Sequence, residues 1–295
     1  MSSDERLLSL VSAEVGENED QQTFWSKVLE FPPGDSPAFV ARDYDKRLPL
    51  HVAADKKAPP EVLQFLARHT PETGGSDGEC SVAVCHLMVA RMWDEAAAAV
   101  GSATDEELNA EDQWHRTPLM WALIRRAPEA VLDALVARLP CGARACETQQ
   151  RRYALHYAAE NAMRHPRGIE AGAELALQIL EAFPPACHER DAQYGVLPLH
   201  LAVSNAAPEN LTKALLAEFP GGIHVRDTAG YSVLTYAVGG NLTGKVPPLG
   251  SLNAVIDACP LTLQVGDRDY RCLPLHWACF DAAQPLSIVQ TLFDR

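Results

Sequence analysis

The chain has few basic residues for its length. Its 295 residues include 25 lysines and arginines against 39 aspartates and glutamates, which gives a formal net charge of −14 at pH 7. Binding to nucleic acid needs a net basic surface or a large basic patch, and anionic membranes attract basic segments. The charge balance therefore argues against nucleic acid and against an anionic membrane surface as the main partner.

Long apolar runs and secretion signals are also missing. No stretch approaches the roughly 18 consecutive apolar residues that a membrane-spanning helix needs. The first residues, Met1 to Arg6, lack the basic region and following apolar region that mark a secretory signal. We therefore expect an intracellular, cytoplasmic protein without direct membrane insertion, with an organelle or the nucleus left open.

The eight cysteines contain no C-x-x-C pair, which is the usual building block of a zinc site. Cys80, Cys85 and His86 lie close together, but no second pair has the spacing to complete a site. We expect scattered buried thiols and no metal. The nucleophile elbow, the kinase signature and H-E-x-x-H are absent as well, so we expect no enzymatic activity.

One segment, Gly239 to Lys245, matches the phosphate-loop pattern G-x-x-x-x-G-K. The next residue is Val246 instead of the serine or threonine that holds magnesium. Pro247 and Pro248 then block the helix that should begin inside the motif. The segment therefore lacks both the residue and the helix start that a phosphate loop needs, so we expect no bound nucleotide and no other cofactor.

Proline is the residue in excess, with 21 copies, or about 7% against a usual share of roughly 5%. Such an excess is compatible with disorder, but a composition with 47% hydrophobic and 22% charged residues is typical of a chain that forms a core.

The prolines instead follow a repeat. Leu-Pro-Leu-His begins at residues 48, 197 and 273, Thr-Pro-Leu-Met begins at 117, and weaker copies begin at 153 and 233. The central leucine of each copy, here called the anchor, lies at 50, 119, 155, 199, 234 and 275, and a degenerate copy lies at 87.

A second proline pattern follows the anchors. Prolines 59, 128, 208 and 248 each precede an amphipathic run that stops at another proline twelve residues later. Proline is tolerated in a first helical turn and cannot continue a helix. We therefore expect short helices to begin at Pro49, Pro118, Pro198 and Pro274, and long helices to begin after Pro59, Pro128, Pro208, Pro248 and Pro285. Long helices should end at Pro71, Pro140, Pro184, Pro220 and Pro260. We expect further helices over 24–31 and 175–183, and we place the extra length of some repeats in loops at 161–172 and 239–250.

The repeat resembles the ankyrin consensus. Asn109-Ala-Glu-Asp112, leading to Thr117-Pro-Leu119, is similar to the Asn-Ala-x-Asp turn and Thr-Pro-Leu-His start of that family, and Asp227 to Leu234 is similar too. The resemblance implies an all-α solenoid of stacked helical hairpins with short β-hairpin-like turns. We expect a helical capping region over 1–42 and an array over 43–295 of about seven units. The array departs from the consensus in two ways: leucine replaces the threonine at 48, 197 and 273, and the turn glycine is replaced at Lys46, His115, Arg151 and Arg271.

Four histidines occupy one equivalent position, at 51, 156, 200 and 276. A metal or catalytic set would not need that periodicity, so we interpret them as structural groups at the helix starts.

Aromatic and basic residues gather near the turn tips and the ends of the short helices, which line the concave face in ankyrin-like proteins. Tyr, Trp and Arg dominate interface energetics. The predicted partner-binding residues are Tyr44, Arg47, Lys56, Trp114, Arg116, Arg125, Arg152, Tyr194, Tyr231, Tyr270 and Arg271. Packing between turns, or compensation of helix dipoles, would explain the same residues without a partner.

These patterns favour a non-catalytic protein–protein interaction module, an adaptor or scaffold that holds an acidic or aromatic segment of a partner protein. A first alternative is a permanent structural subunit of a larger assembly, which would use the bare C-terminal helix around Leu292 and Phe293 and the long loops. A second alternative is an enzyme or nucleotide-dependent regulator, which has only the loop at 239–246 in its support. The oligomeric state is not predicted.

Overall fold

The computed structural model describes residues 3–13, 21–32, 38–39, 41, 48–56, 58–69, 83–89, 91–112, 114–238, 248–268, 271–280 and 285–295. The chain forms two compact units, Met1–Ala134 and Leu135–Arg295, and each is described by itself. Within the described residues the structure is helical, with two isolated antiparallel bridges and no extended strand.

In the first unit, helices of seven and ten residues alternate from α4 to α7. Helix α4 packs against α5 and α6, and α6 packs against α7 and α9. The last helix of the unit, α10, runs across the boundary into the second unit. The helices are α1 (Ser3–Ser12), α2 (Gln21–Leu29), α4 (Pro49–Asp55), α5 (Pro60–His69), α6 (Ala83–Val89), α7 (Trp93–Ser102), α8 (Asp105–Asn109), α9 (Pro118–Arg125) and α10 (Glu129–Val136).

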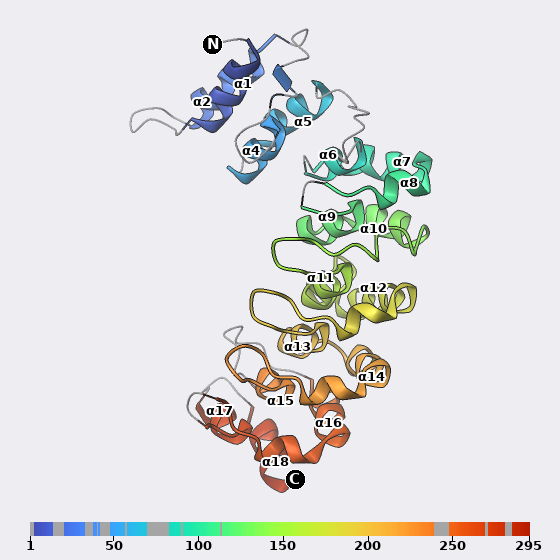
Figure 1. Ribbon diagram of the computed structural model, residues 1–295, viewed down its shortest axis with the longest axis vertical. Coiled ribbons are helices and arrows are strands. Elements are labelled where there is room, and N and C mark those ends of the chain that lie inside the picture. The colour runs from blue at the N-terminus through green and yellow to red at the C-terminus, as the bar shows by residue number, and fades with distance from the viewer. Residues whose placement is uncertain are drawn as a thin grey trace. The chain divides into compact units, whose positions relative to one another are not determined.

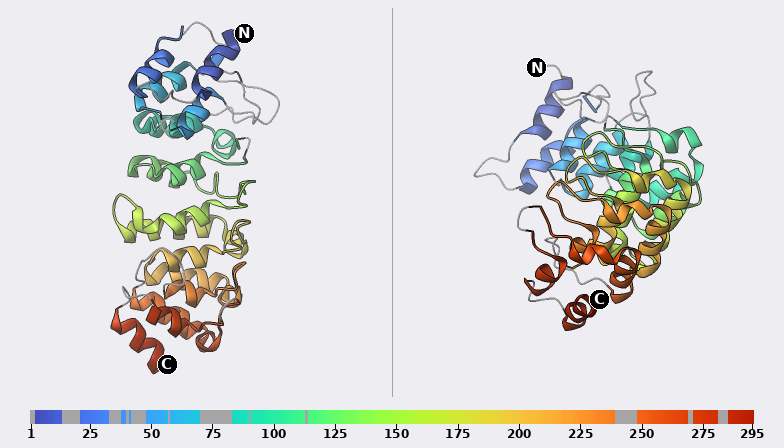
Figure 2. Two further views of the ribbon diagram at one scale, coloured as in Figure 1. Left: turned by 90° about the vertical axis from the view of Figure 1, so that its left-hand side faces the viewer. Right: turned by 60° about the horizontal axis from the view of Figure 1, so that its bottom comes forward.

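The second unit contains helical pairs stacked in chain order, with the short helices in one column and the long helices in another (Figure 1). Two further views show the same stacked helical pairs (Figure 2). The short helices are α11 (Ala154–Asn161), α13 (Pro198–Ser204), α15 (Val233–Ala237) and α17 (Pro274–Phe280). The long helices are α12 (Ile169–Ala182), α14 (Glu209–Glu218), α16 (Leu249–Ala258) and α18 (Leu286–Asp294). One-turn 3-10 helices lie between them at η1 (Ala162–Arg164), η2 (Pro184–His188), η3 (Pro220–His224) and η4 (Pro260–Gln264).

The prolines that were predicted to open helices do so. Pro49, Pro118, Pro198 and Pro274 are the first residues of α4, α9, α13 and α17. Pro208, Pro248 and Pro285 immediately precede α14, α16 and α18. Those predicted to close long helices have an additional role, because Pro184, Pro220 and Pro260 each begin a 3-10 turn that carries the chain towards the next hairpin-like turn.

Two predicted boundaries are wrong. Helix α10 ends at Val136, four residues before Pro140, and the chain continues in turns. The predicted loop over 161–172 is largely helical, because η1 covers 162–164 and α12 begins at Ile169. Gly172 makes this possible: a Cβ at that position would lie 2.0 Å from the Ala162 carbonyl oxygen, so only glycine lets the two helices approach this closely. The predicted loop over 239–250 lies partly outside the described residues, and α16 already begins at Leu249.

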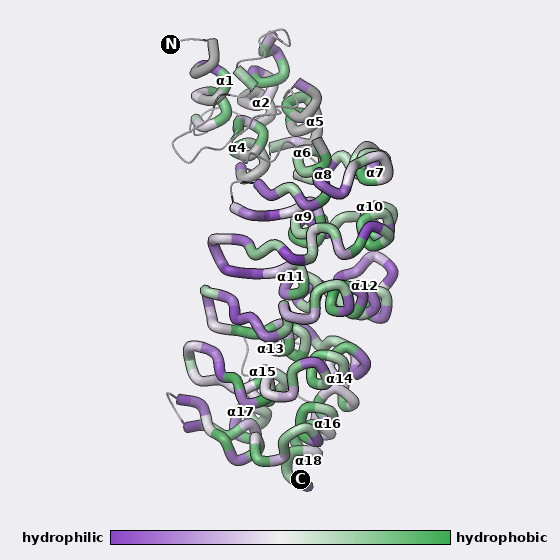
Figure 3. Tube along the Cα trace, turned by 45° about the vertical axis from the view of Figure 1, so that its right-hand side comes forward, coloured by the Kyte–Doolittle hydropathy of each residue, from purple (hydrophilic) through white to green (hydrophobic). Residues whose placement is uncertain are grey.

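The core of each unit lies between the helices, and the turns are polar. The anchors Leu50, Leu119, Leu155, Leu199 and Leu234 are all buried. Figure 3 shows the turns of the second unit as hydrophilic segments that project from the hydrophobic helical pairs. Successive turns there are joined by backbone hydrogen bonds, since Ala192 N–H donates to the Gln150 carbonyl at 2.6 Å and Thr228 N–H to the Tyr194 carbonyl at 2.9 Å.

The structural interpretation of the histidines is confirmed at the three positions whose side chains are described. The Nδ1 atom of His156, His200 and His276 accepts a hydrogen bond from the backbone N–H three residues earlier, at 3.2, 3.2 and 2.8 Å. In the repeats where the earlier residue is Thr117 or Ser232, its hydroxyl instead accepts from the backbone N–H three residues later. The chain therefore uses two alternative caps for the same helix start.

Candidate functional site

Each turn from residue 112 onwards contains a buried acidic side chain, and most of these accept hydrogen bonds from backbone N–H groups of their own turn. Asp112 Oδ1 accepts from the backbone N–H groups of Trp114 and Arg116 at 2.8 and 2.9 Å. Asp227 Oδ1 accepts from Tyr231 N–H at 2.7 Å. The acids are Asp112, Glu147, Asp191, Asp227 and Asp267, and all are buried. The sequence analysis named Asp112 and Asp227 only as parts of two turns and did not identify this series.

A sequence signal for these acids existed. Each lies seven or eight residues before an anchor leucine. Two residues after the anchor, an aromatic donor often completes the arrangement: Trp121 Nε1 donates to Asp112 Oδ2 at 2.9 Å, and Trp277 Nε1 donates to Asp267 Oδ2 at 2.9 Å. The acids are therefore structural groups, and their regularity separates them from a catalytic pair.

In the first unit the structure brings three of the predicted residues together around one that was not predicted. The Arg116 guanidinium lies 5.2 Å from the Trp114 ring centroid and 5.1 Å from that of Trp121. The Arg125 guanidinium lies 5.3 Å from the Trp121 centroid, and the two indoles meet edge to face at 6.4 Å. We call these four residues the Trp114 cluster. Cation–π stacking of this kind fixes long arginine side chains in place.

The Trp114 cluster rests on Asp112. Burial raises the pKa of the Asp112 carboxyl, although the N–H groups of Arg116 and Trp114, the Trp121 indole and the Arg116 charge all oppose that shift. Trp121 is buried, whereas Trp114, Arg116 and Arg125 are half-buried and reach the surface. The cluster therefore presents one indole and two guanidinium groups over a rigid base.

In the second unit, Arg152 has an internal role. Its guanidinium donates to Asp191 Oδ2 at 2.9 and 3.1 Å and to Glu160 Oε2 at 2.8 Å, and its side chain is buried. Burial lowers the pKa of Arg152, but the hydrogen bond to Asp191 and the charge of Glu160 outweigh burial and hold it above its ordinary value. The side chain joins two neighbouring repeats, so we exclude it from a partner-binding surface.

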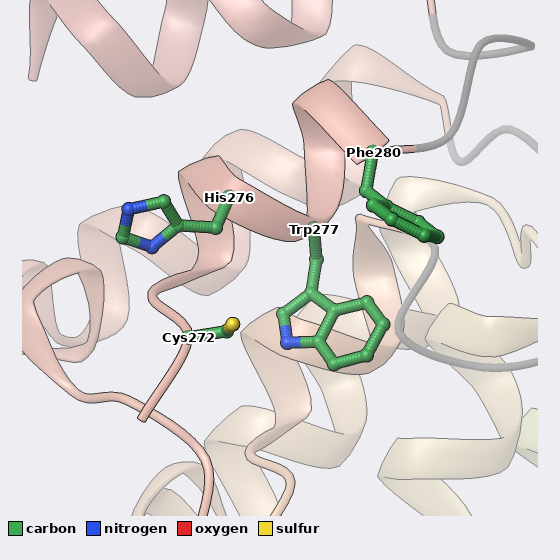
Figure 4. Close-up of a pocket in the computed structure, with 4 residues that line it drawn as sticks. All are labelled: Cys272, His276, Trp277 and Phe280. Atoms are coloured by element: carbon green, nitrogen blue, oxygen red, sulfur yellow. The ribbon is translucent and has the colours of Figure 1, made fainter. Parts of the chain in front are cut away.

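Tyr231 belongs to an aromatic cluster that the sequence interpretation missed. Its ring meets Trp277 edge to face at 5.6 Å and Tyr236 at 6.4 Å, and Trp277 meets Phe280 at 6.3 Å. Trp277 and Phe280, with Cys272 and His276, line a pocket of about 310 Å³ (Figure 4). The signal was the aromatic residue two positions after the anchor, which the sequence analysis did not single out.

The other predicted residues lie apart from these clusters. Tyr194 is 51% exposed at a turn tip, and Arg271 is exposed at another. Lys56 Nζ donates to the carbonyls of Ser12 and Ala13, at the end of α1. Tyr44, Arg47 and Tyr270 lie outside the described residues.

The residues that the sequence analysis considered for a metal or nucleotide site lie partly outside the described residues. Among the described residues, no cluster of histidine, cysteine, aspartate or glutamate has a geometry that could hold a metal ion. Cys80, the His86 side chain and the loop from Gly239 to Pro247 lie outside what is described. Within the same residues, every helix is too short or too polar to cross a membrane.

Similarity to known proteins is found in structure alone. No family model matches the chain, and no curated protein does. The crystal structure of EF0377, an ankyrin repeat protein, matches with a TM-score of 0.51 at 15% identity, over 72% of this chain and 96% of that one. A chain in the complex of the predatory endopeptidase Bd0816 from Bdellovibrio bacteriovorus with the immunity protein Bd3460 matches with a TM-score of 0.50 at 16% identity, over 72% and 97%. At such identities the likeness concerns the fold.

Proposed function

We propose that this chain, whose fold is the all-α ankyrin-repeat fold, is a non-catalytic protein–protein interaction module. In this proposal it acts as an adaptor or scaffold that holds an acidic or aromatic segment of a partner protein on the side of the short helices and turns. The Trp114 cluster is the observation that carries the proposal. The proposal keeps the intracellular, cytoplasmic location expected from the sequence.

The Trp114 cluster has the composition and the rigidity of an interface hot spot. Arg116 stacks against two indoles, and Arg125 stacks against one of them. Trp and Arg are enriched among residues whose truncation costs the most binding energy. Because the stacking already fixes the guanidinium groups, less side-chain entropy is lost when a carboxylate binds them. In a chain with a net charge of −14, two fixed arginines also give a local site for an acidic segment.

The test removes the exposed part of the cluster. The variant Trp114→Ala, Arg116→Ala, Arg125→Ala keeps the buried Trp121 and its bond to Asp112, so it should fold. We expect a partner that is pulled down from cells by the native chain to be lost with this variant. A control with Arg144→Ala and Arg167→Ala also removes two arginines, both exposed and elsewhere, and should retain the partner. Undiminished capture by the folded triple variant would exclude the Trp114 cluster as the binding surface.

A permanent structural subunit is the second candidate, and one observation favours it. Phe280, Leu286 and Phe293 are 85%, 78% and 78% exposed within the last helical pair. Apolar side chains of this size are buried in many assembly interfaces. An enzyme or nucleotide-dependent regulator has no support among the described residues, since the loop from 239 to 246 lies outside them.

A further inference from the structure

The pocket on α17 is a surface that the proposed role of the Trp114 cluster does not use. It is lined by Cys272, at the end of a turn, and by His276, Trp277 and Phe280 on the helix, and we call it the α17 pocket (Figure 4). Its wall is rigid, because the Trp277 indole is held by Asp267 on one side and by the Tyr231 ring on another. Phe280 forms the outer edge and is 85% exposed.

The repeats within the second unit show what covers the same positions elsewhere. Cys272 and His276 lie three residues before and one residue after their anchor, as Arg152 and His156 do in an earlier repeat. There the next repeat covers both side chains. Asp191 binds the Arg152 guanidinium, and the Glu189 carbonyl accepts from His156 Nε2 at 3.2 Å.

Two other repeats show an aromatic side chain in the covering role. His200, which is equivalent to His276, is met edge to face by the Tyr236 ring of the following repeat, with ring centroids 5.2 Å apart. Tyr231, which is equivalent to Cys272, is met by Trp277 of the following repeat. The residue at position 272 is a small thiol, which leaves more room for a ring than tyrosine or arginine would.

Polar groups beside the pocket define the rest of the occupant. His276 Nδ1 accepts from Leu273 N–H, so the neutral ring carries its proton on Nε2 and offers a donor, as His156 does. Arg268 and Arg271 are exposed on the turn that leads to the pocket. Among the described acids nearby, Asp267 accepts from the Trp277 indole and Asp257 pairs with Arg295. Arg268 and Arg271 are the guanidinium groups with which acidic residues of a ligand would pair.

We infer that the α17 pocket binds a tryptophan or tyrosine side chain from an acidic segment of a partner protein. The ring takes the place that Tyr236 and Trp277 occupy in the interior repeats. A carbonyl or carboxylate of the segment accepts from His276 Nε2, and neighbouring acidic residues pair with Arg268 and Arg271. The inference rests on the proposed interaction role but not on the Trp114 cluster.

The test uses the 295-residue chain and a fluorescein-labelled peptide with one tryptophan between glutamates, followed by fluorescence anisotropy. Phe280→Ser should weaken binding by about tenfold or more, as expected when an aromatic wall of a pocket is removed. Arg271→Glu should weaken it severalfold and reduce its dependence on salt. Phe293→Ser is the matched control, because it removes an equally exposed aromatic side chain that does not line the pocket, and it should leave the affinity unchanged.

Three results would overturn the inference. A peptide with alanine for tryptophan, or lysine for glutamate, could bind equally well. Phe280→Ser could bind as tightly as the native chain. Sedimentation could show a dimer that Phe280→Ser dissociates, which would make a second copy the occupant. The triple variant of the Trp114 cluster should bind the peptide normally, so failure at the α17 pocket and failure of the proposed function give different results.

Discussion

A buried carboxylate lies in each turn from residue 112 onwards, and most of them stabilise the turn by accepting hydrogen bonds from its backbone N–H groups. Asp191 shows the principle most clearly, because Oδ1 accepts from Tyr194 and Val196 N–H inside its own turn. Its Oδ2 accepts from Arg152 of the preceding repeat. At the position where other repeats supply an aromatic donor, this repeat has Leu201, which cannot donate a hydrogen bond. The guanidinium from the neighbouring repeat therefore serves this acid.

Replacing Asp191 by alanine should strongly destabilise the second unit. The change leaves the buried Arg152 charge without its main partner, and breaking a buried ion pair in this way costs about 3–5 kcal/mol. Asp257→Ala removes the exposed pair with Arg295 and should cost about 0–1 kcal/mol. Urea unfolding of both variants measures the difference, and similar losses for the two would contradict an internal role for Asp191.

Arg151 occupies a strained turn position, with a φ of 52° where an interior repeat has Gly195 at 69°. Left-handed backbone costs a residue with a Cβ about 1–2 kcal/mol, part of which the greater chain entropy of glycine cancels. Arg151→Gly should therefore raise the free energy of unfolding by about 0.5–1 kcal/mol. Arg151→Val should lower it, because a β-branched side chain tolerates this region least. Thermal unfolding of both variants checks the sign, and a stabilising valine would refute the argument.

At the scale of the helical element, the same start is capped in two ways. Thr117 and Ser232 cap with a hydroxyl, whereas His156, His200 and His276 accept from the preceding N–H with an imidazole nitrogen. The sequence departure at 197 and 273, where leucine replaces threonine, thus coincides with a histidine cap. The histidine cap requires a neutral ring, because a protonated imidazole has no acceptor nitrogen.

The histidine caps should make stability depend on pH. Burial lowers the pKa of His156 and of His200 to about 4, from an ordinary value of 6.5. Between these values the unfolded state binds more protons, so the contribution is complete above pH 6.5 and is lost as the pH falls towards 4. Each histidine should cost roughly 2 kcal/mol between pH 7 and pH 5.

Urea unfolding at pH 7, 6 and 5 measures this loss. The variant His200→Met places at this position the residue that Met120 supplies in an earlier repeat, so it should keep the fold and remove one histidine's share of the slope. Proton NMR of the imidazoles gives an independent value. Midpoints near 6.5 for His156 and His200 would contradict the buried neutral caps.

At the scale of the whole molecule, the proposed binding surfaces depend on side chains that differ from one repeat to the next. Repeats bury their apolar faces against their neighbours, and stability is shared along the stack. The Trp114 cluster in the first unit and the α17 pocket in the second both use the recurrent aromatic position two residues after the anchor, at Trp121 and Trp277. The residues around that position differ, with Arg125 in one repeat and Phe280 in the other.

An adaptor that binds a different protein should not need a second copy of itself. We therefore expect the isolated chain to sediment as a monomer at micromolar concentration, with the exposed Phe280, Leu286 and Phe293 leaving it soluble because they are few. Sedimentation velocity over a range of concentrations checks this. Stable self-association would favour the structural-subunit alternative over the adaptor.

Much of the fold could be predicted because it depends on local chemistry. The position of proline at Pro49, Pro118, Pro198 and Pro274 fixes where short helices begin, since proline has no N–H to lose there. The start of α12 could not be predicted in this way. It depends on how closely Gly172 approaches Ala162, which is a contact between two helices.

The candidate surfaces were likewise predicted only in part from the sequence. Residue types and spacing were enough to select Trp114, Arg116 and Arg125, because the repeat brings turn and helix end together. Their convergence on Trp121, the internal role of Arg152 and the α17 pocket required the tertiary structure. By itself the sequence determined the repeating unit and its helix starts, since these follow from interactions within a few residues. Only the packing of one repeat on the next decided which polar groups are buried in pairs and which lie at the surface, because burial depends on residues that are distant in the chain.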